Sequence, residues 1–451
     1  MNRRDWLQWA ALSTAMAGCG GSGGSGGSGG DGSASRPNVL MIAVDDLNDW
    51  VGYLGGHPQV KTPAIDALAA RSHAFTRAYC TAPVCSASRA GVLSGLSVAS
   101  TGVVDNLSTF KQQHPTWRQF DEMLAASGYD TARYGKIDHV YEPFVSPLPT
   151  PIPYSNLKCP ARKDEGAFDW GPVNVADNQM PDYRYADQGI NFLSGRDATT
   201  PFCLSVGFIR THVGWYVPPR FFDMYPIDEV VVPRVPADEL DDLGTTGKAI
   251  AQKFNFHQCI VGQSLWASAV QGYLASISWV DSQIARLIAA LDANPAIANN
   301  TVVVLWSDHG FHLGEKFHWH KEALWDHSTR VPCLVRVPGQ TTGVVQTRCI
   351  SLADLTPTML DLCGVTPDYA MDGHSLRPLL ADANTNWDYP VVSSLDGVHH
   401  AVRTPQWRYI RYAGGEHELY DEVNDPDEHV NLAGDPARAA LIAQLAALLP
   451  A

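Results

Sequence analysis

Two polar pairs stand directly after apolar runs, and their residue types and spacing suggest chemistry. Asp45-Asp46 follow residues 38–44, and Asp308-His309 follow residues 301–306. Neighbouring carboxylates repel each other, and a divalent cation removes that repulsion. Carboxylate oxygens select Ca²⁺ or Mg²⁺ over zinc, although His309 is an unusual partner for such an ion. A single acidic pair is more often a cap or a solvated turn, but two polar pairs at two strand ends favour a metal site.

A cysteine near the start of a helix is the second candidate. The segment Cys85-Ser86-Ala87-Ser88-Arg89 follows a turn at Pro83 and opens a helical stretch of small residues, Ala90 to Gly95. Unpaired backbone N–H groups and the helix dipole favour negative charge at such a position. A lone cysteine here is more often structural than catalytic, so the surrounding sequence must decide between the two interpretations.

The elements around these residues predict how they come together. Residues 38–44, 201–208 and 301–306 are typical of strands buried on both faces of a parallel sheet, and residues 264–291 have helical periodicity. Strands that alternate with helices predict an α/β fold, here a large mixed, mainly parallel sheet flanked by helices. Ligands bind outside the carboxyl ends of such strands, where both polar pairs fall.

The C-terminal part of the chain has a different pattern of apolar segments. From about residue 350 the apolar segments become shorter, at 389–393, 400–403, 408–412 and 418–420, before an Ala/Leu-rich stretch. These lengths predict a smaller α+β subdomain with a short antiparallel sheet and a terminal helix. Residues 141–185 are rich in proline and polar residues, and we expect either a long surface excursion near the site or a plain loop.

Length and charge limit the choice of partners. A chain of 451 residues exceeds the size at which single cores stop growing, about 250–300 residues, so a second lobe is expected. The formal net charge of -15 would repel polyanions, which argues against nucleic acid or an anionic membrane as the main partner. An anionic substrate would have to be attracted by a local cluster of basic residues.

The cysteine segment resembles the signature of a known family. Residues 82–95 are similar to the sulfatase pattern Cys-x-Pro-x-Arg, with Cys85 and Arg89 at its ends, and the likeness runs from Asn38 to Leu432. The resemblance implies an alkaline-phosphatase-like fold and a formylglycine made from Cys85 by a maturation enzyme. Ala87 stands where proline is usual. The family's radical-type maturation enzymes accept alanine there, whereas the oxygen-dependent type prefers proline, so the route of activation stays open.

The resemblance also implies a metal and a set of site residues. One Ca²⁺ per chain would be bound by Asp45, Asp46, Cys85, Asp308 and His309. The segments Gly135-Lys136-Ile137-Asp138-His139, Arg210-Thr211-His212 and Trp319-His320-Lys321 match further parts of the family pattern. Each of these His or Lys residues alone would more often lie on the surface.

The family implies a role for each matched residue. Arg89 would fix the formylglycine hydrate, and Lys136 and Lys321 would clamp sulfate. His212 would protonate the leaving oxygen, and His139 would take a proton from the hydrate after a covalent sulfo-enzyme intermediate has formed. Together these side chains supply the local basic cluster that an acidic protein needs to hold sulfate.

The branch of the family and its substrate are predicted from finer similarities. Asp308-His309 and residues 314–321 are similar to iduronate-2-sulfatase-like members, which implies a sulfated carbohydrate substrate. Four aromatic residues flank the predicted site and would either stack on sugar rings or pack in the core: Trp215, Tyr216, Trp319 and Trp325. The alternatives are a phosphomonoester or phosphonate ester hydrolase of the same superfamily, and a noncatalytic sulfated-glycan-binding protein that is never matured because of Ala87.

The N-terminus has the pattern of a targeting segment. Arg3-Arg4 before a short apolar stretch resembles a twin-arginine signal, and Met16-Ala17-Gly18-Cys19 resembles a lipoprotein cleavage box with Cys19 lipidated. An ordinary cleaved signal without lipid is the alternative. We expect a periplasmic or cell-surface lipoprotein of a bacterium. The predicted parts are an export signal (1–19), a Gly/Ser-rich linker (20–35), a catalytic domain (36–349) and a smaller subdomain (350–451).

The remaining cysteines carry little information. The chain has nine cysteines, which leaves seven beside Cys19 and Cys85, and none of them forms a Cys-x-x-Cys pair. An odd number cannot all pair, so one or two disulfides are expected in an oxidising compartment, with connectivity open.

Overall fold

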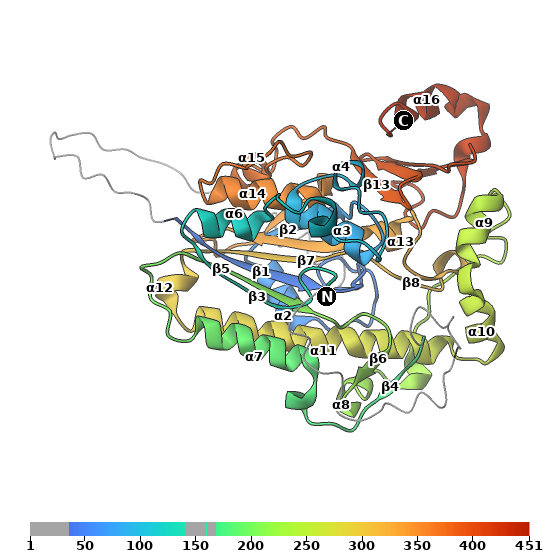
Figure 1. Ribbon diagram of the computed structural model, residues 1–451. Coiled ribbons are helices and arrows are strands. Elements are labelled where there is room, and N and C mark those ends of the chain that lie inside the picture. Colours follow the sequence, from blue (N-terminus) through green and yellow to red (C-terminus); the bar gives the residue numbers. More distant parts are fainter. Residues whose placement is uncertain (1–35, 141–158, 160–167, 451) are drawn as a thin grey trace, which may run out of the picture.

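The computed structural model describes residues 36–140, 159 and 168–450 (Figure 1). The predicted export signal and linker, and most of residues 141–167, lie outside the described residues, so the expectations for them stay predictions. Within the described ranges, no helix combines the length and apolar character needed to cross a membrane.

A mixed eight-stranded sheet forms the centre of the molecule (Figure 1). The strand order is β11-β2-β10-β7-β1-β5-β3, and β12 also pairs with β2. The neighbours β7, β1, β5 and β3 are parallel, whereas β10 is antiparallel to both β2 and β7. The bounds are β1 Asn38–Val44, β2 His73–Tyr79, β3 Asp130–Gly135, β5 Phe202–Phe208, β7 Thr301–Ser307, β10 Arg330–Arg336, β11 Val344–Gln346 and β12 Ile350–Ser351.

The central strand β1 shows why the apolar runs predict this sheet. All of its residues are buried, because β5 and β7 cover its edges and helices cover both faces. Leu40 and Ile42 pack into one hydrophobic cluster, whereas Val39 and Met41 pack into another. A strand with two buried faces needs a nearly continuous run of apolar side chains, and residues 39–44 have this pattern.

Helices lie on both faces of the sheet (Figure 1). α7 (Pro181–Leu193) and α11 (Trp266–Asp292) cover one face, and α3 (Cys85–Ser94), α6 (Phe120–Ala126) and α14 (Leu355–Leu362) lie over the other. The predicted fold class is therefore confirmed. The other helices are α2 Pro63–Ala69, α4 Val98–Thr101, α5 Phe110–Gln113, α8 Pro219–Phe222, α9 Thr245–Ala251, α10 Phe256–Gly262, α12 Pro295–Ala298, α13 Asp326–Thr329, α15 Arg377–Ala381 and α16 Ala439–Ala446.

A four-stranded antiparallel sheet occupies the C-terminal part, as predicted. It consists of β13 (Val391–Leu395), β14 (His399–Arg403), β15 (Trp407–Arg411) and β16 (His417–Asp421), paired in chain order. The closing helix α16 packs through Leu445 against the hydrophobic face of this sheet. Residues 350–351 still pair with β2, so backbone hydrogen bonds join the large sheet to the chain at the expected domain boundary.

Part of the proline-rich region is regular, which corrects the expectation of an irregular segment as far as Tyr185. β4 (Trp170–Pro172) pairs with β6 (Trp215–Val217), and α7 begins at Pro181. Proline is well suited to the first turn of a helix, where its missing N–H is not needed. Tyr185 is fully buried within α7.

One disulfide joins Cys159 to Cys259 of α10 across a sequence separation of 100. Six cysteines among the described residues carry free thiols, all of them buried: Cys80, Cys85, Cys203, Cys333, Cys349 and Cys363. One disulfide agrees with the expected number.

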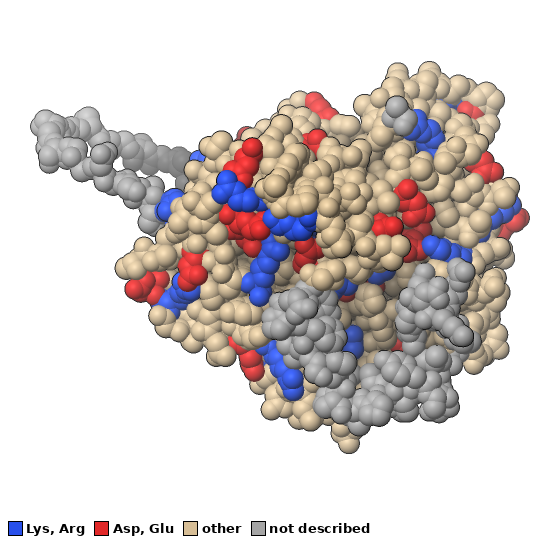
Figure 2. All heavy atoms as spheres, in the orientation of Figure 1, with Lys and Arg blue, Asp and Glu red and all other residues tan. Residues whose placement is uncertain are grey.

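The face of the molecule shown in Figure 2 does not display the net charge as a single patch. On the face shown in Figure 2, acidic and basic side chains of the described residues are interspersed among uncharged ones. Attraction of an anion to this face would therefore depend on a local arrangement.

Candidate active site

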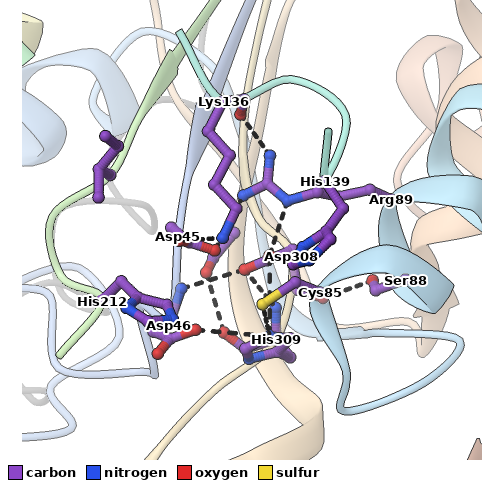
Figure 3. A network of polar contacts seen from close by, with 12 residues as sticks. Asp45, Asp46, Cys85, Ser88, Arg89, Lys136, His139, His212, Asp308 and His309 are labelled. Atoms are coloured by element: carbon purple, nitrogen blue, oxygen red, sulfur yellow. Dashed lines mark hydrogen bonds and ion pairs between the residues drawn. The ribbon is translucent and has the colours of Figure 1, made fainter. Parts of the chain in front are cut away.

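The carboxyl ends of four neighbouring parallel strands bring the predicted site residues together (Figure 3). Asp45-Asp46 follow β1, Asp308-His309 follow β7, His212 lies beyond β5, and Lys136 and His139 lie beyond β3. Because parallel strands end at the same edge of a sheet, residues far apart in sequence become neighbours there. The Asp46 N–H donates to Asp308 Oδ1 at 3.0 Å, which joins the first two strand ends directly.

A close approach between the ends of the paired strands β3 and β5 positions Lys136. Gly135 has a φ of 72°, and a Cβ on Gly207 would lie 2.0 Å from the Lys136 carbonyl oxygen. Only glycine tolerates this approach, so the two glycines let the chain turn sharply before Lys136.

Four side chains form a group that could hold a metal ion. Ligand atoms of Asp45, Asp46, Cys85 and His309 all lie within 4.8 Å of one another, and all four residues are buried. His309 Nδ1 donates to the Gly310 carbonyl at 3.0 Å, so the other ring nitrogen, Nε2, faces Cys85 and Asp46. Asp46 Oδ2 is buried without a hydrogen-bond partner among the described residues. An uncompensated carboxylate oxygen fits a hard cation, so the donor set suits Ca²⁺.

Asp308, the fifth predicted ligand, is not in this group. Its Oδ2 accepts from Arg89 Nε at 2.8 Å and lies 3.7 Å from His309 Nε2. Arg89 also reaches Asp45 Oδ1 at 3.2 Å and the backbone carbonyl of Ile137 at 3.1 Å. In the structure, the buried guanidinium thus links three of the strand ends.

Both predicted lysines are buried against the acidic pair. Lys136 Nζ lies 2.5 Å from Asp45 Oδ2, and Lys321 Nζ lies 2.7 Å from Asp46 Oδ1. Burial would raise the pKa of Asp45, but Lys136 and Arg89 hold it well below its usual value. Burial likewise disfavours the charged form of Lys321, but Asp46 raises its pKa well above the usual value. The Asp45 carboxylate and the Lys321 ammonium group therefore stay ionised at neutral pH.

Cys85 is the first residue of α3 and faces this charged group. Its Sγ lies 3.1 Å from Lys321 Nζ and 3.3 Å from His309 Nε2. Burial would raise the pKa of the thiol, but Lys136 and Lys321 lower it well below its usual value. The next residue, Ser86, donates its backbone N–H to Asn106 Oδ1 at 3.0 Å, so the start of the helix is fixed by a distant side chain.

The two predicted proton carriers are held differently. His212 Nδ1 donates to the Val213 carbonyl at 2.6 Å, which leaves Nε2 to exchange protons. Burial lowers the pKa of His212, and the protonated ring is therefore a stronger acid than a solvated histidine. His139 is half-buried, and its Nδ1 is without a hydrogen-bond partner among the described residues.

Several residues that hold the site were not predicted from the sequence. Tyr273 of α11 donates to the Asp46 carbonyl at 2.7 Å, and Ser307 accepts from the Leu47 N–H at 2.9 Å. Thr211 donates its hydroxyl to the Asp45 carbonyl at 3.0 Å. A tyrosine inside an apolar helix has no sequence signal that separates a support for the site from ordinary core packing.

The four aromatic residues proposed for sugar stacking lie in the core. Trp215, Trp319 and Trp325 are at most 1% exposed, and Tyr216 is 7% exposed. Trp215 packs edge-on against Tyr273 at a centroid distance of 5.3 Å. Core packing, the alternative interpretation, is therefore correct for these side chains.

Comparison with known proteins gives a family. The Sulfatase family profile matches residues 37–365, and the profile described as N-sulphoglucosamine sulphohydrolase, C-terminal, matches residues 314–451. A sulfatase of Formosa agariphila is 31% identical over 92% of this chain and 86% of that protein. Iduronate 2-sulfatase of Homo sapiens is 30% identical over 68% of this chain and 60% of that protein.

Solved structures share the fold. The phosphonate monoester hydrolase of Agrobacterium radiobacter has a TM-score of 0.75 at 22% identity, over 91% of this chain and 94% of that one. A protein solved with its substrate D-glucosamine-2-N,6-O-disulfate has a TM-score of 0.71 at 22% identity, over 92% and 97% of the two chains. The family match spans most of the chain, and we conclude that it belongs to the sulfatase family and is a sulfuric ester hydrolase.

Proposed function

We propose that the chain hydrolyses sulfate esters of a sugar or polysaccharide, with a formylglycine made from Cys85 and one Ca²⁺. The observation that carries the proposal is the position of Cys85 Sγ, which lies against Lys321 and His309 within the group of metal ligands. A buried thiol in a purely structural role would not need an ammonium group, an imidazole and two carboxylates around it.

Calcium would be held by Asp45, Asp46, Asp308 and His309 together with residue 85. It would supply positive charge against the sulfate oxygens and the nucleophilic oxygen. The buried Asp46 Oδ2, which has no hydrogen-bond partner in the described ranges, supports this assignment. Replacing Asp46 by Asn should weaken Ca²⁺ binding by at least about tenfold, because the ion loses a charged ligand. Calorimetric titration with CaCl₂ measures this, and unchanged affinity would contradict the assignment.

Side chains of the protein would bind the sulfate, orient residue 85 and transfer protons. A sulfate monoester is anionic, so catalysis requires cations around its nonbridging oxygens and a proton for the leaving alkoxide. Lys136 and Lys321 would bind the sulfate oxygens, and Arg89 would orient residue 85. His212 would donate the proton from Nε2 to the leaving oxygen, and His139 would accept a proton at residue 85.

Intact-mass analysis of the peptide that contains Cys85 tests the maturation step. Conversion of cysteine to formylglycine removes about 18 Da. The mass should change when a formylglycine-generating enzyme is co-expressed, and a comparison of the radical type with the oxygen-dependent type would show which of them accepts Ala87 in place of proline. An unchanged cysteine in a protein with full activity would overturn the proposal. Turnover of an aryl sulfate, an aryl phosphate and an aryl phosphonate by the matured protein then separates sulfatase from phosphomonoester or phosphonate hydrolase activity.

The sugar substrate and the cellular location are proposals of the same kind. The named sugar substrate of one structural relative supports a sulfated carbohydrate, and the similarity to iduronate 2-sulfatase supports that branch only distantly. We propose export by a twin-arginine route and a lipid anchor at Cys19. The disulfide Cys159–Cys259 fits an oxidising compartment. Labelling with a fatty acid that is lost in Cys19→Ala tests the anchor.

A further inference from the structure

The segment that carries Lys321 cannot hold its shape by itself. The Lys321 hairpin, residues 312–321, consists of β8 (His312–Leu313), a short turn at Glu315–Phe317 and β9 (Trp319–His320). Two strands of two residues each are too short for a stable isolated hairpin. Four non-glycine residues in or next to the hairpin have positive φ: Lys316, Phe317, His320 and Glu322. Such backbone persists only where surrounding contacts impose it.

A buried ion pair supplies one such contact at the tip of the hairpin. Lys316 Nζ lies 2.7 Å from Glu239 Oε1, and the two side chains are 2% and 1% exposed. The same ammonium group donates to the backbone carbonyl of Glu428. Glu239 comes from the segment before α9, and Glu428 follows β16, so Lys316 fastens the hairpin to two other parts of the chain.

Each partner of Lys316 is itself held in place. Glu239 Oε2 lies 2.6 Å from His429 Nδ1. Glu428 Oε1 pairs with Arg408 at 2.5 Å, and Glu428 Oε2 accepts the Asp326 N–H at 2.8 Å. The ammonium group of Lys316 thus enters a preformed site of fixed acceptors, which makes its position well defined.

A second contact fixes the other end of the hairpin. His318 Nε2 donates to the Lys321 carbonyl at 2.8 Å, while its Nδ1 lies 3.3 Å from the Ala251 carbonyl. This places the backbone of Lys321, and its side chain then reaches Asp46 and Cys85. A shift of the hairpin tip would be passed along a short, strained backbone to that side chain.

We propose that Lys316, clamped by Glu239 and the Glu428 carbonyl, is a positioning residue that sets the Lys321 ammonium group for sulfate binding. This inference rests on the proposed function of Lys321 as a sulfate ligand. Lys316 touches neither substrate nor the reacting atoms, and it acts only through the hairpin.

Three variants of the matured protein test the inference, with turnover of an aryl sulfate and inhibition by inorganic sulfate as readouts. In Lys316→Met and Glu239→Gln, kcat/KM should fall and the inhibition constant for sulfate should rise by about 10- to 100-fold, because small displacements of a binding group have effects of this size. Calcium affinity should not fall by more than about twofold, because neither variant removes a proposed calcium ligand and a displaced Lys321 would compete less with the ion for Asp46. Asp281→Asn is the control, because Asp281 is also a buried carboxyl but accepts the backbone N–H groups of Ala64 and Ile65, neither of which belongs to the hairpin.

Hydrogen exchange of peptides covering residues 312–321 gives a readout that does not depend on activity. Exchange there should rise in Lys316→Met and not in Asp281→Asn. If Lys316→Met does not fold, the pair Lys316→Met with Glu239→Met removes both charges and retains volume, which buried ion pairs often tolerate. A folded variant with wild-type sulfate inhibition and wild-type exchange would overturn the inference. A wild-type protein that is matured yet inert on every sulfate ester would instead overturn the proposed function, while the exchange result would still decide whether Lys316 orders the hairpin.

Discussion

Two groups of buried charge in this chain differ in how their members meet. In the candidate active site, Arg89, Lys136 and Lys321 converge on one acidic pair, and Asp46 Oδ2 has no hydrogen-bond partner within the described part of the chain (Figure 3). The second group, here called the interface network, joins the large sheet to the C-terminal sheet. Its members are Asp49, Asp326, His327, Arg330, Arg403, Arg408, Glu422 and Glu428.

In the interface network, opposite charges alternate. Arg408 pairs with Asp326, Glu422 and Glu428, and Arg330 pairs with Asp49 and Asp326. Charges that satisfy one another have little left for a ligand, whereas charges that converge keep capacity for one. Burial and charge alone therefore do not mark a functional site. The site is marked by charged side chains that converge on one place and leave part of their charge unpaired.

The largest expected contrast comes from Cys85→Ala. Turnover of an aryl sulfate should disappear, because the nucleophile cannot be formed. The unfolding midpoint should stay close to wild type, since the change removes few atoms from a site that is not built for stability. Residual turnover well above background in a preparation free of wild-type protein would break the distinction between the two groups.

Removal of Arg408 should have the opposite signature. Arg408→Met leaves Glu428, Glu422 and Asp326 buried with fewer cations, and breaking a buried ion pair in this way costs about 3–5 kcal/mol. Chemical denaturation measures the loss. Turnover by the molecules that remain folded should fall far less than in Cys85→Ala. A variant as stable as wild type would show that the interface network does not hold the two sheets together.

A smaller effect is expected for His212→Ala, and it depends on the substrate. Alkyl sulfates need a proton at the leaving oxygen and should be hydrolysed about 100-fold more slowly, whereas aryl sulfates have better leaving groups and should be affected less. The kcat/KM values for one alkyl and one aryl sulfate measure the difference. Equal losses on both substrates would remove His212 from the role of proton donor.

The smallest effect concerns Asp281, a buried carboxyl outside both groups that accepts the backbone N–H groups of Ala64 and Ile65. Burial raises the pKa of Asp281 to about 7 from 3.8. The unfolded chain then loses its proton at lower pH than the folded chain, so this contribution to stability is complete below pH 3.8 and is lost as pH rises toward 7. The slope is at most about 1.4 kcal/mol per pH unit. Asp281→Asn should flatten the curve of unfolding free energy between pH 4.5 and 6.5, which are about the limits of that window. An unchanged slope would contradict the assigned shift.

The strand ends that carry the site could be predicted from the sequence because each of them is marked by a local pattern of residues. Residues 39–44 of β1 and 302–306 of β7 are all apolar, and the polar pairs that follow them are conspicuous. The fold class was therefore predicted correctly, and four of the five predicted ligands come together with both predicted lysines beside them. The site roles themselves stay predictions.

Other features depend on contacts between distant segments and left no local signal. The bond from Tyr273 to the Asp46 backbone and the clamp on Lys316 are of this kind. The sequence left both sugar stacking and core packing open for Trp319 and Trp325, because a buried and an exposed tryptophan look alike in one sequence, and the structure shows core packing. The helix from Pro181 was missed because polar residues on its outer face obscure the apolar ones.

The cross-link between Cys159 and Cys259 makes the stability of the protein depend on the redox conditions around it. Closing a loop of 100 residues restricts the unfolded chain. In the chain-entropy account this is worth up to about 4.7 kcal/mol at 25 °C. The same polypeptide should thus withstand heat and proteases better under oxidising conditions than in a reducing cytosol, and dithiothreitol should lower its unfolding free energy by an amount of that order.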